Sequence, residues 1–371
     1  MNNTPRTLVL GAGIVGRAAT WDLDRRGHAV TLADVDGDLA VANASALGVD
    51  HATADAADTA AVAALLRSHD AVVSAVPYSY GVRLASAAVA AGCHYFDFGG
   101  NPTIVKEQLR LGPSAESADV AVVPDCGLAP GVANVMAAGL IEEAGDHPIA
   151  SVQIRVGCLP QHPVGTLNYQ LAFYPGGLIN EYAEPCEVIA GGVAATVEPL
   201  TRIEDVTWEG WGPLEAFSTA GGTSTMCQDY EGRVGELEYK TLRYPGHGAI
   251  FAAMRELGLF ETEPRPVSGI SPRTMLLDLL YENLPSGGPD VVLVRVEVAT
   301  EAETLTMEIE DVDDGSFSAL ARTTAFPATA LCDLIARGTV PFRGAAAMSA
   351  AAPPGPLMEE LAQTGITAVR R

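Results

Sequence analysis

A glycine-rich turn near the start of the chain has the spacing of a phosphate-binding loop. Gly11, Gly13 and Gly16 form a Gly-x-Gly-x-x-Gly pattern, which we place between an expected strand at 7–10 and an expected helix at 16–26. In that context the first glycine permits a tight turn, the second lets the backbone approach a pyrophosphate, and the third allows close packing of helix on strand. The free N–H groups at a helix start attract phosphate. The pattern therefore predicts a dinucleotide-binding site.

An acidic residue completes this motif at the end of the second expected strand, which covers 29–33. Asp34 stands where a carboxylate binds the hydroxyl groups of the adenosine ribose. A negative charge there repels a 2′-phosphate, and no arginine occurs in residues 35–39. We therefore expect NAD rather than NADP. The agreement of strand, turn, helix and acid disfavours the alternative of a purely structural glycine turn. The other residues that we expect to line the cofactor are Ile14, Val15, Val35, Asp55, Ala75, Val76 and Pro77.

Two cations in the second half of the chain are candidates for binding an anionic substrate group. Arg243 is suited to grip a carboxylate through two parallel hydrogen bonds. Lys240 stands out because Lys106 is the only other lysine in the sequence. The two residues are three apart, so on a continuous strand they face opposite sides of the sheet, and at most one points into a pocket unless a bulge intervenes. The alternatives are a salt bridge for Arg243 and a chance surface position for Lys240.

Two aspartates are candidates for the acid–base chemistry of an amine. Asp97 and Asp125 lie at or just beyond the ends of expected strands at 94–97 and 121–124, where doubly wound folds bind ligands. Either carboxylate is able to hold an ammonium group or to take its proton. Capping of a turn or a helix is an equally weighted alternative for both.

Four further residues are candidates for hydrogen bonding or for shaping a substrate pocket: Tyr169, Thr223, Thr225 and His247. Packing of one domain on the other is an equal alternative for Tyr169. For His247 we favour a hydrogen-bonded structural role over that of a catalytic base. The cysteines form no Cys-x-x-Cys pair and the histidines show no metal-ligand spacing, so we expect buried free thiols and no metal site.

The hydrophobic pattern changes character along the chain. Strands and helices are expected to alternate through the first third, which predicts an α/β fold with a Rossmann-type, doubly wound parallel sheet. Later segments such as 151–156 and 291–298 alternate apolar and polar residues, which predicts a second, α+β domain with a mostly antiparallel sheet. Long inserts at 157–187 and 208–250 are expected to be irregular. The expected domains are an NAD-binding domain at 1–130, a substrate-binding and dimerisation domain at 131–325, and a helical segment at 326–371 that packs back on the first domain.

The composition disfavours several classes of partner. The chain has 371 residues, of which 22 are basic and 46 acidic, and its formal net charge is −24. Nucleic acid and anionic membranes are therefore poor partners. Apolar stretches are interrupted well short of the ~20 residues that span a membrane, and the start of the chain lacks the pattern of a secretory signal. We expect a cytoplasmic protein that binds a small molecule, with no nucleic-acid or membrane partner.

Several longer segments resemble those of a known family. Asp97-Phe-Gly-Gly100, Pro124-Asp-Cys-Gly-Leu-Ala-Pro-Gly131 and Tyr174-Pro-Gly-Gly-Leu-Ile-Asn-Glu-Tyr182 resemble the saccharopine dehydrogenase family. Gly221-Gly-Thr-Ser-Thr225 and the run from Tyr239-Lys240 to His247 are most similar to its L-lysine 6-dehydrogenase branch. The resemblance covers nearly the whole chain. It departs from that branch at 75–78 and 161–163, and both segments are candidates to line the pocket.

The resemblance implies an NAD-dependent amino-acid dehydrogenase that acts on a CH–NH2 group. The reaction it implies is oxidative deamination of L-lysine at the ε-amine, giving the 6-semialdehyde, its cyclised piperideine carboxylate and ammonia. In such an enzyme the nicotinamide accepts the hydride, while the protein fixes the substrate's charged groups and accepts a proton. The resemblance also implies a homodimer or higher homo-oligomer, and the strand at 291–298 is a candidate to extend a sheet across subunits.

Two alternatives remain open. One is an oxidoreductase like saccharopine or carboxynorspermidine dehydrogenase, which acts on a secondary amine and needs a pocket for two linked fragments. The other is a non-catalytic NAD-binding sensor that keeps the fold. The presence together of all four charged candidates, the two cations and the two aspartates, argues mildly against the sensor.

Overall fold

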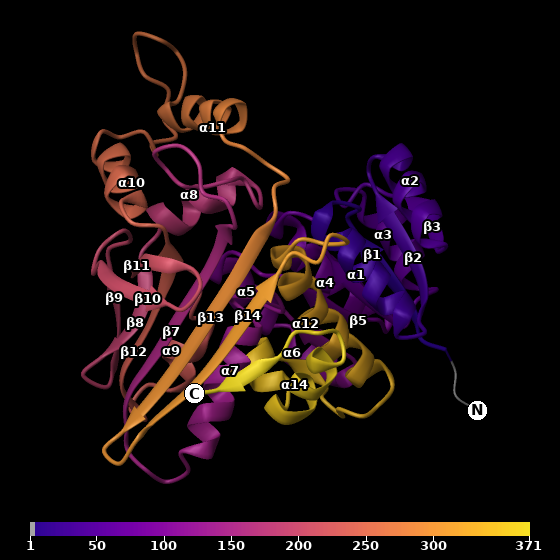
Figure 1. The fold of residues 1–371 in the computed structure, drawn as a ribbon. Coiled ribbons are helices and arrows are strands. Elements are labelled where there is room, and N and C mark those ends of the chain that lie inside the picture. The colour runs from indigo at the N-terminus through magenta and orange to yellow at the C-terminus, as the bar shows by residue number, and fades with distance from the viewer. Residues whose placement is uncertain (1–3) are drawn as a thin grey trace. The chain divides into compact units, whose positions relative to one another are not determined.

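The computed structural model describes residues 4–371, which divide into two compact units (Figure 1). Unit 1 contains the chain up to Gly139 together with Ala321–Thr367. Unit 2 contains Leu140–Leu320 together with Ala368–Arg371. The chain therefore leaves unit 1 after Gly139, returns to it at Ala321, and leaves it again to end in unit 2.

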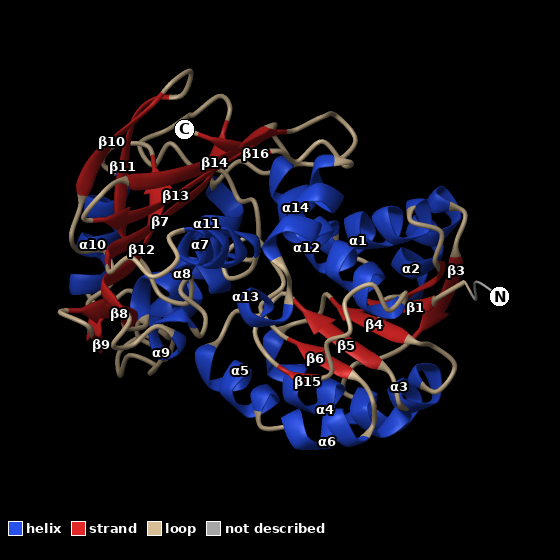
Figure 2. Ribbon diagram, turned by 90° about the horizontal axis from the view of Figure 1, so that it is seen from below, coloured by secondary structure: helices blue, strands red, loops and turns tan. Residues whose placement is uncertain are grey.

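Unit 1 is built on a seven-stranded parallel sheet (Figure 2). Its strands are β1 (Arg6–Leu10), β2 (Ala29–Asp34), β3 (Asp50–Thr53), β4 (Ala71–Ser74), β5 (His94–Asp97), β6 (Ala121–Val123) and β15 (Gly344–Ala345). They lie in the order β15-β6-β5-β4-β1-β2-β3, and all neighbouring pairs are parallel. The winding reverses between β1 and β4, which is where doubly wound folds open a crevice for ligands.

Helices cover both faces of this sheet, because strands such as β4 are buried along their whole length and need cover on both sides. On one face α1 (Ile14–Arg25) contacts α12 (Ala319–Ala336): the rings of Trp21 and Phe326 stack at 5.7 Å, and Thr329 donates a 2.6 Å hydrogen bond to Asp22. Figure 2 shows α2 (Gly37–Leu47) and α14 (Pro354–Ala362) on this same side of the sheet. The other face carries α3 (Thr59–Leu66), α4 (Gly81–Ala91), α5 (Pro102–Leu109) and α6 (Gly112–Ser117). The remaining helical elements are a 3-10 turn at Tyr78–Tyr80, α7 (Val132–Glu143) and α13 (Met348–Ala351).

Unit 2 is built on a nine-stranded, mostly antiparallel sheet. Its strands are β7 (Ile149–Pro160), β8 (Cys186–Ala190), β9 (Val193–Val197), β10 (Glu204–Trp208), β11 (Gly212–Ser218), β12 (Val234–Arg243), β13 (Asp290–Thr300), β14 (Thr304–Val312) and β16 (Ala368–Arg370). The main path runs β10-β11-β12-β7-β13-β14-β16, and β8 and β9 pair beside β12. Only β7 and β12 are parallel neighbours among the described strands of this unit.

An aromatic cluster forms the core on the helical side of unit 2. It brings together α8 (Pro175–Ala183), α10 (His247–Glu256), α11 (Pro272–Asn283) and β11. The short helix α9 (Met226–Asp229) lies outside this cluster and contacts β8. The buried side chains at its centre are Tyr169, Leu178, Tyr182, Phe217, Phe251 and Leu280. Burial of such large side chains stabilises by about 1.5–3 kcal/mol each. The cluster therefore fixes α8 and α10 against the sheet.

Two sequence-based expectations about unit 2 are wrong. The inserts at 157–187 and 208–250 are not irregular, because they contain α8, the whole of β11 and β12, and the start of α10. The strand at 291–298 does not offer a free edge for a subunit contact, because β13 lies between β7 and β14 and its backbone groups are already paired with both. A homo-oligomer remains a prediction, but the strand at 291–298 no longer supports it.

The boundaries of the units differ in detail from the expected domains. The first division falls within α7 at Gly139 rather than at residue 130, and the chain re-enters unit 1 at Ala321 rather than at 326. The strand β16 pairs with β14, so the last residues belong to unit 2. The expectation about a secretory signal partly concerns residues 1–3, which lie outside the described residues. In the described part of the chain no helix is both long and apolar enough to cross a membrane.

Candidate functional site

The candidate cofactor residues follow the carboxyl ends of parallel strands in unit 1. The glycine-rich turn follows β1, Asp34 ends β2, and residues 75–77 follow β4. Because these strands are parallel and adjacent, their carboxyl ends meet at one edge of the sheet. This edge includes the reversal point between β1 and β4, so the sequence-predicted residues are brought together where a dinucleotide is expected to bind.

The three glycines of the turn differ in what surrounds them. Gly11 has a φ of +102°, and a Cβ there would lie 2.6 Å from the carbonyl oxygen of Ala75. A Cβ on Gly16 would overlap the carbonyl oxygen of Gly11. A Cβ on Gly13 would meet no atom within 4 Å. Two glycines are therefore required by the fold itself, whereas Gly13 leaves open space beside the start of α1, as a bound pyrophosphate needs. The turn fits a dinucleotide.

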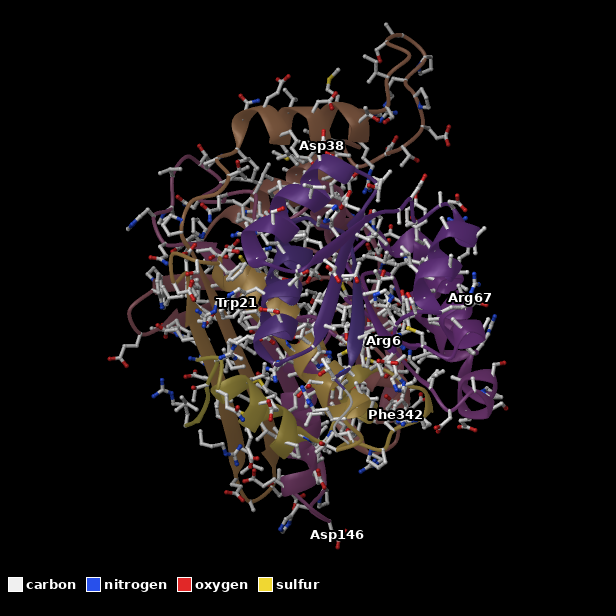
Figure 3. All side chains as sticks on the ribbon, turned by 90° about the vertical axis from the view of Figure 1, so that its right-hand side faces the viewer. Arg6, Trp21, Asp38, Arg67, Asp146 and Phe342 are labelled. Carbon is white, nitrogen blue, oxygen red and sulfur yellow. The ribbon has the colours of Figure 1, made fainter. Side chains whose placement is uncertain are left out.

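Asp34 is held against this turn. Its Oδ2 accepts a 2.6 Å hydrogen bond from the backbone N–H of Ala12, and its Oδ1 accepts a 2.9 Å bond from the N–H of Asp36. Asp36 in turn caps α2, which starts next to Asp38 on the surface (Figure 3). The carboxylate of Asp34 therefore both shapes the turn and stands in an acidic neighbourhood. Such surroundings repel an added phosphate.

The other proposed cofactor-lining residues are mostly accessible. Ile14, at the start of α1, and Val35, directly after β2, are 66% and 67% exposed. Asp55 is exposed and accepts a 2.8 Å hydrogen bond from the N–H of Ala57. At the same edge of the sheet Pro77 is exposed, and Val76 and Ala75 are half-buried.

Asp97 is buried at the end of β5 and is fully engaged by neighbours in unit 1. It accepts hydrogen bonds from Tyr95 Oη at 2.9 Å, Gln108 Nε2 at 2.6 Å, and the N–H groups of Gly99 and Asp125 at 2.9 and 3.3 Å. Burial raises the pKa of Asp97, although these hydrogen bonds oppose the rise. These hydrogen bonds fit the alternative in which Asp97 caps a turn rather than binding a substrate.

Asp125 adopts a conformation that is rare for a residue with a side chain. Its φ is +59°, in the left-handed region, and such strain tends to be retained at functional sites. Gly99 makes room for it, since a Cβ on Gly99 would overlap the carboxylate oxygen Oδ1 of Asp125. The adjacent Cys126 is buried, and burial raises the pKa of its thiol, so it is an unreactive neighbour. Asp125 is therefore the stronger of the two aspartate candidates.

Arg243 lies at the end of β12 in unit 2, with 3% of the residue exposed. Its Nε donates to Tyr182 Oη at 3.2 Å, and its Nη1 donates to the carbonyl of Leu242 at 3.0 Å. The guanidinium also lies 5.3 Å from the ring centroid of Tyr169. Burial by itself lowers the pKa of Arg243, but the neighbouring tyrosines and Glu181 raise it above the usual value. The residue is therefore a permanent buried cation.

Hydrogen bonds run in one direction from Arg243 to His247. The Tyr182 hydroxyl accepts from Arg243 and lies 3.0 Å from His247 Nε2, to which it donates because the proton of the neutral imidazole is on Nδ1. His247 Nδ1 lies 3.1 Å from the carbonyl of Leu167, which only accepts, so Nδ1 carries the proton. Burial, and then the charge of Arg243, lower the pKa of His247 to about 3. His247 is thus a neutral histidine that orients Tyr182, and its free lone pair is already used.

Glu181 is a member of this cluster that sequence reasoning missed. It precedes Tyr182 on α8, and its electrostatic neighbours include Arg243 and Tyr239. Burial raises the pKa of Glu181 to about 7, against the opposing effect of Arg243. Its only sequence signal was its place in the Asn-Glu-Tyr end of the segment 174–182. A motif of that length gives no indication of which side chain faces the sheet.

Lys240 and Arg243 lie on opposite faces of the sheet, because successive side chains of β12 point to alternate faces. Its Nζ lies 2.6 Å from Glu204 and 3.5 Å from Glu238. Arg155 pairs with the same two glutamates, at 2.6 Å each. This ion-pair network involves none of the aromatic residues around Arg243. Lys240 is therefore placed in a structural network and not with the candidate substrate anchor.

The two threonine candidates lie in the loop after β11. Thr223 is buried, and Thr225, which precedes α9, donates a 2.6 Å hydrogen bond to Asp229 at the end of that helix. The loop contacts α8 through the N–H of Ala220, which donates a 2.9 Å bond to the carbonyl of Glu181. The structure thus brings Tyr169, His247 and Arg243 into one cluster, whereas the hydrogen bond of Thr225 is to α9 and not to that cluster.

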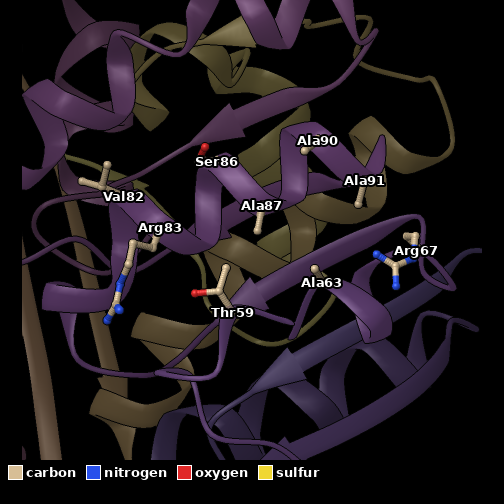
Figure 4. Close-up of a pocket in the computed structure, with 9 residues that line it drawn as sticks. All are labelled: Thr59, Ala63, Arg67, Val82, Arg83, Ser86, Ala87, Ala90 and Ala91. Atoms are coloured by element: carbon tan, nitrogen blue, oxygen red, sulfur yellow. The ribbon is translucent and has the colours of Figure 1, made fainter. Parts of the chain in front are cut away.

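A groove on unit 1 has a different character. It has a volume of about 530 Å³ and lies between α3 and α4. It is lined by four alanines together with Thr59, Val82, Ser86, Arg67 and Arg83 (Figure 4). None of the motif residues lines it. Within residues 4–371, no group of three or more His, Cys, Asp and Glu side chains is arranged to hold a metal ion.

Comparison with known proteins links both units to one family. The model described as "Saccharopine dehydrogenase NADP binding domain" matches residues 7–123, and that described as "Saccharopine dehydrogenase C-terminal domain" matches residues 127–366. A curated saccharopine dehydrogenase (NADP(+), L-glutamate-forming) from Pyricularia oryzae is 25% identical over 285 residues, which are 71% of this chain and 60% of the relative. The chain thus spans about 60% of that relative's length.

A solved structure confirms the fold class. Apo saccharopine dehydrogenase (L-Glu forming) from Saccharomyces cerevisiae superposes with a TM-score of 0.83 at 18% identity, covering 99% of both chains. At that identity the likeness concerns the fold. The expected combination of a parallel Rossmann-type sheet with a second, mostly antiparallel sheet is therefore confirmed.

Proposed function

The chain belongs to the saccharopine dehydrogenase family, and on that premise we propose that it catalyses the NAD-dependent oxidative deamination of L-lysine at the ε-amine. Lysine, NAD and water give ammonia, NADH, a proton and the 6-semialdehyde, which cyclises to a piperideine carboxylate. The observation that carries the proposal is Arg243. It is a buried guanidinium on an aromatic wall in the family's C-terminal domain, suited to a carboxylate.

The role of each part of the chain follows from its chemistry. When bound, NAD supplies a hydride acceptor. The glycine turn and Asp34 hold the dinucleotide by backbone N–H groups and a carboxylate. Arg243 binds the α-carboxylate of lysine through two parallel hydrogen bonds. An extended lysine then presents its ε-carbon several bonds away from that anchor. Asp125 is our candidate to receive the proton of the amine.

Preference for NAD is a further part of the proposal. We expect at least a tenfold preference over NADP, about 1.4 kcal/mol, because the charge of Asp34 opposes a 2′-phosphate. The variant Asp34→Asn keeps an oxygen that is able to accept from the N–H of Ala12 but removes the charge. It should fold normally and lose most of the preference. The measurement is kcat/KM with each cofactor at limiting concentration.

A matched control for this variant is Asp58→Asn. Asp58 also accepts from backbone N–H groups at a helix start, that of α3, but lies outside the glycine motif. Its replacement should leave the ratio of the two cofactors unchanged. Equal kcat/KM values for NAD and NADP in the unaltered protein would contradict the proposed role of Asp34.

The bond that breaks is tested with isotopically labelled lysine. Lysine deuterated only at carbon 6 should transfer deuterium to the NADH formed and should slow the hydride step, because that C–H bond is cleaved. Lysine deuterated only at carbon 2 should do neither. Mass spectrometry of the NADH and single-turnover rates provide the two readouts.

The possible results separate the proposal from its alternatives. Label arriving from carbon 2 would make the protein an α-amino-acid dehydrogenase and reverse our orientation of the substrate. If lysine yields no NADH, an enzyme acting on a secondary amine is tested next with saccharopine, where a second amino acid and no ammonia is released. Cofactor binding without turnover of any amine would identify the sensor.

A further inference from the structure

Two opposite charges in unit 2 lie near each other without pairing. Arg243 and Glu181 interact electrostatically, yet they form no ion pair within 4.0 Å among the described residues. Arg243 uses Nε and Nη1 for protein acceptors, and in residues 4–371 its Nη2 makes no hydrogen bond. The carboxylate of Glu181 likewise has no hydrogen-bond partner in that part of the chain. Both groups therefore retain binding capacity.

Neither group is sealed off from a ligand. Completely buried side-chain atoms without a partner occur elsewhere in the described residues, but Nη2 of Arg243 and the carboxylate oxygens of Glu181 are not among them. The two side chains come from rigid elements, since Arg243 ends β12 and Glu181 lies on α8. The hydrogen bond from Arg243 to Tyr182 holds α8 against the strand, and the bond from Ala220 fixes the backbone of Glu181.

A cation and an anion placed in this way are complementary to a zwitterion. An α-amino acid carries its carboxylate and ammonium on adjacent atoms, so it fits between two opposite charges that are too far apart to pair directly. It would satisfy the open Nη2 and the open carboxylate at once. A simple carboxylate would satisfy only Arg243 and would leave Glu181, which is half-buried, without a partner for its charge.

We infer that Arg243 and Glu181 together form a binding site for the charged end of an α-amino acid, with Arg243 taking the carboxylate and Glu181 taking the α-ammonium. This inference rests on the proposed function for the identity of the substrate. It adds a specificity-determining residue, because Glu181 selects ligands with a free α-amine. The wall of the site is the ring of Tyr169, which contacts the guanidinium.

The test compares two ligands that differ only in the α-amine. L-norleucine carries both the α-ammonium and the carboxylate, whereas hexanoate carries the carboxylate alone. Neither has an amine at carbon 6, so binding is measured by calorimetry on the NAD-saturated protein without any reaction. We expect the unaltered protein to bind L-norleucine at least about tenfold more tightly, as for a hydrogen bond to a charged group. The variant Glu181→Gln should lose this difference while binding hexanoate as before.

Controls separate specificity from folding. Gln keeps the size and shape of Glu181 without its charge, so Glu181→Gln should not unfold the protein, and its thermal transition is recorded alongside. Glu184→Gln is the matched control, because Glu184 follows the same helix and its pKa is also raised by burial. It should leave both affinities unchanged. Arg243→Lys should weaken both ligands.

The inference is overturned if the unaltered protein binds the two ligands equally, if it binds neither, or if Glu181→Gln keeps the preference for L-norleucine. These outcomes are independent of the proposed reaction. Selective binding of L-norleucine combined with no deuterium transfer from carbon 6 would refute the reaction and leave the site standing. Transfer from carbon 6 without selectivity for the α-amine would do the reverse.

Discussion

Replacing Arg243 by Ala is expected to lower kcat/KM for L-lysine by a factor of roughly 30 to several thousand. This factor corresponds to a loss of about 2–5 kcal/mol of transition-state stabilisation. The reason is the buried position of the guanidinium, which gives a desolvated carboxylate no substitute partner once it is removed. The affinity for NAD should barely change, because the glycine turn belongs to unit 1 and Arg243 to unit 2. Steady-state kinetics and NAD titration by fluorescence measure the two quantities separately.

The structure also predicts what the variant does to its surroundings. Tyr182 loses one donor but keeps its bond to His247, so the aromatic cluster should persist with a modest loss of stability. Arg295→Ala is the matched control: Arg295 lies on β13, pairs with Glu308 at 2.6 Å and covers the ring of Trp208. It should cost stability without changing lysine kinetics. An Arg243→Ala protein that unfolds, with normal kinetics in its folded fraction, would show that the arginine is structural.

Local patterns in the sequence were sufficient to predict the first two strands, the glycine turn and the position of Asp34 in unit 1. The glycine turn, the strand that precedes it and the acid after the next strand are contiguous signals, and each follows from backbone geometry over a few residues. The same holds for the separation of Lys240 from Arg243, since a period of two is a property of any strand. These features need no knowledge of distant contacts.

The cluster around Arg243 in unit 2 could be predicted only in part, because its contacts are tertiary. The Arg243–Tyr182 hydrogen bond joins residues 61 positions apart, and no local pattern signals it. Helix α8 was hidden by its first residues, Pro-Gly-Gly, which suggest a loop. Pro175 occupies the start of the helix, where no N–H is needed, and Gly176 lies under the ring of Tyr174, where a Cβ would overlap it. Packing therefore decided the local structure there.

Helix α12 begins earlier than the sequence analysis expected. The helical segment was expected from residue 326, whereas α12 runs from Ala319 to Ala336 with Pro327 inside it. A proline inside a helix costs about 3 kcal/mol in isolation. Burial of Phe326 against Trp21 and the bond from Thr329 to Asp22 offset that cost in unit 1. Such offsets are invisible until the partner helix is in place.

The glycine turn gives the second large effect, as a contrast between two substitutions. Gly13→Ala should leave the thermal stability of the protein nearly unchanged, because the added Cβ meets no atom within 4 Å. It should nevertheless weaken NAD binding by an order of magnitude or more, since the methyl group occupies the space through which a pyrophosphate approaches the backbone. The measurements are a thermal melt of the free protein and a fluorescence titration with NAD.

Gly16→Ala should fail differently, because its Cβ overlaps the carbonyl oxygen of Gly11 and so displaces the backbone of the turn. Overpacking of this kind costs about 1–3 kcal/mol or more, so this variant should lose both stability and NAD binding. The pair thus separates a glycine needed by the ligand from one needed by the fold. If Gly13→Ala binds NAD as well as the unaltered protein does, then the open space beside α1 is not where the pyrophosphate lies. Equal destabilisation by both substitutions would likewise contradict the geometry of the turn.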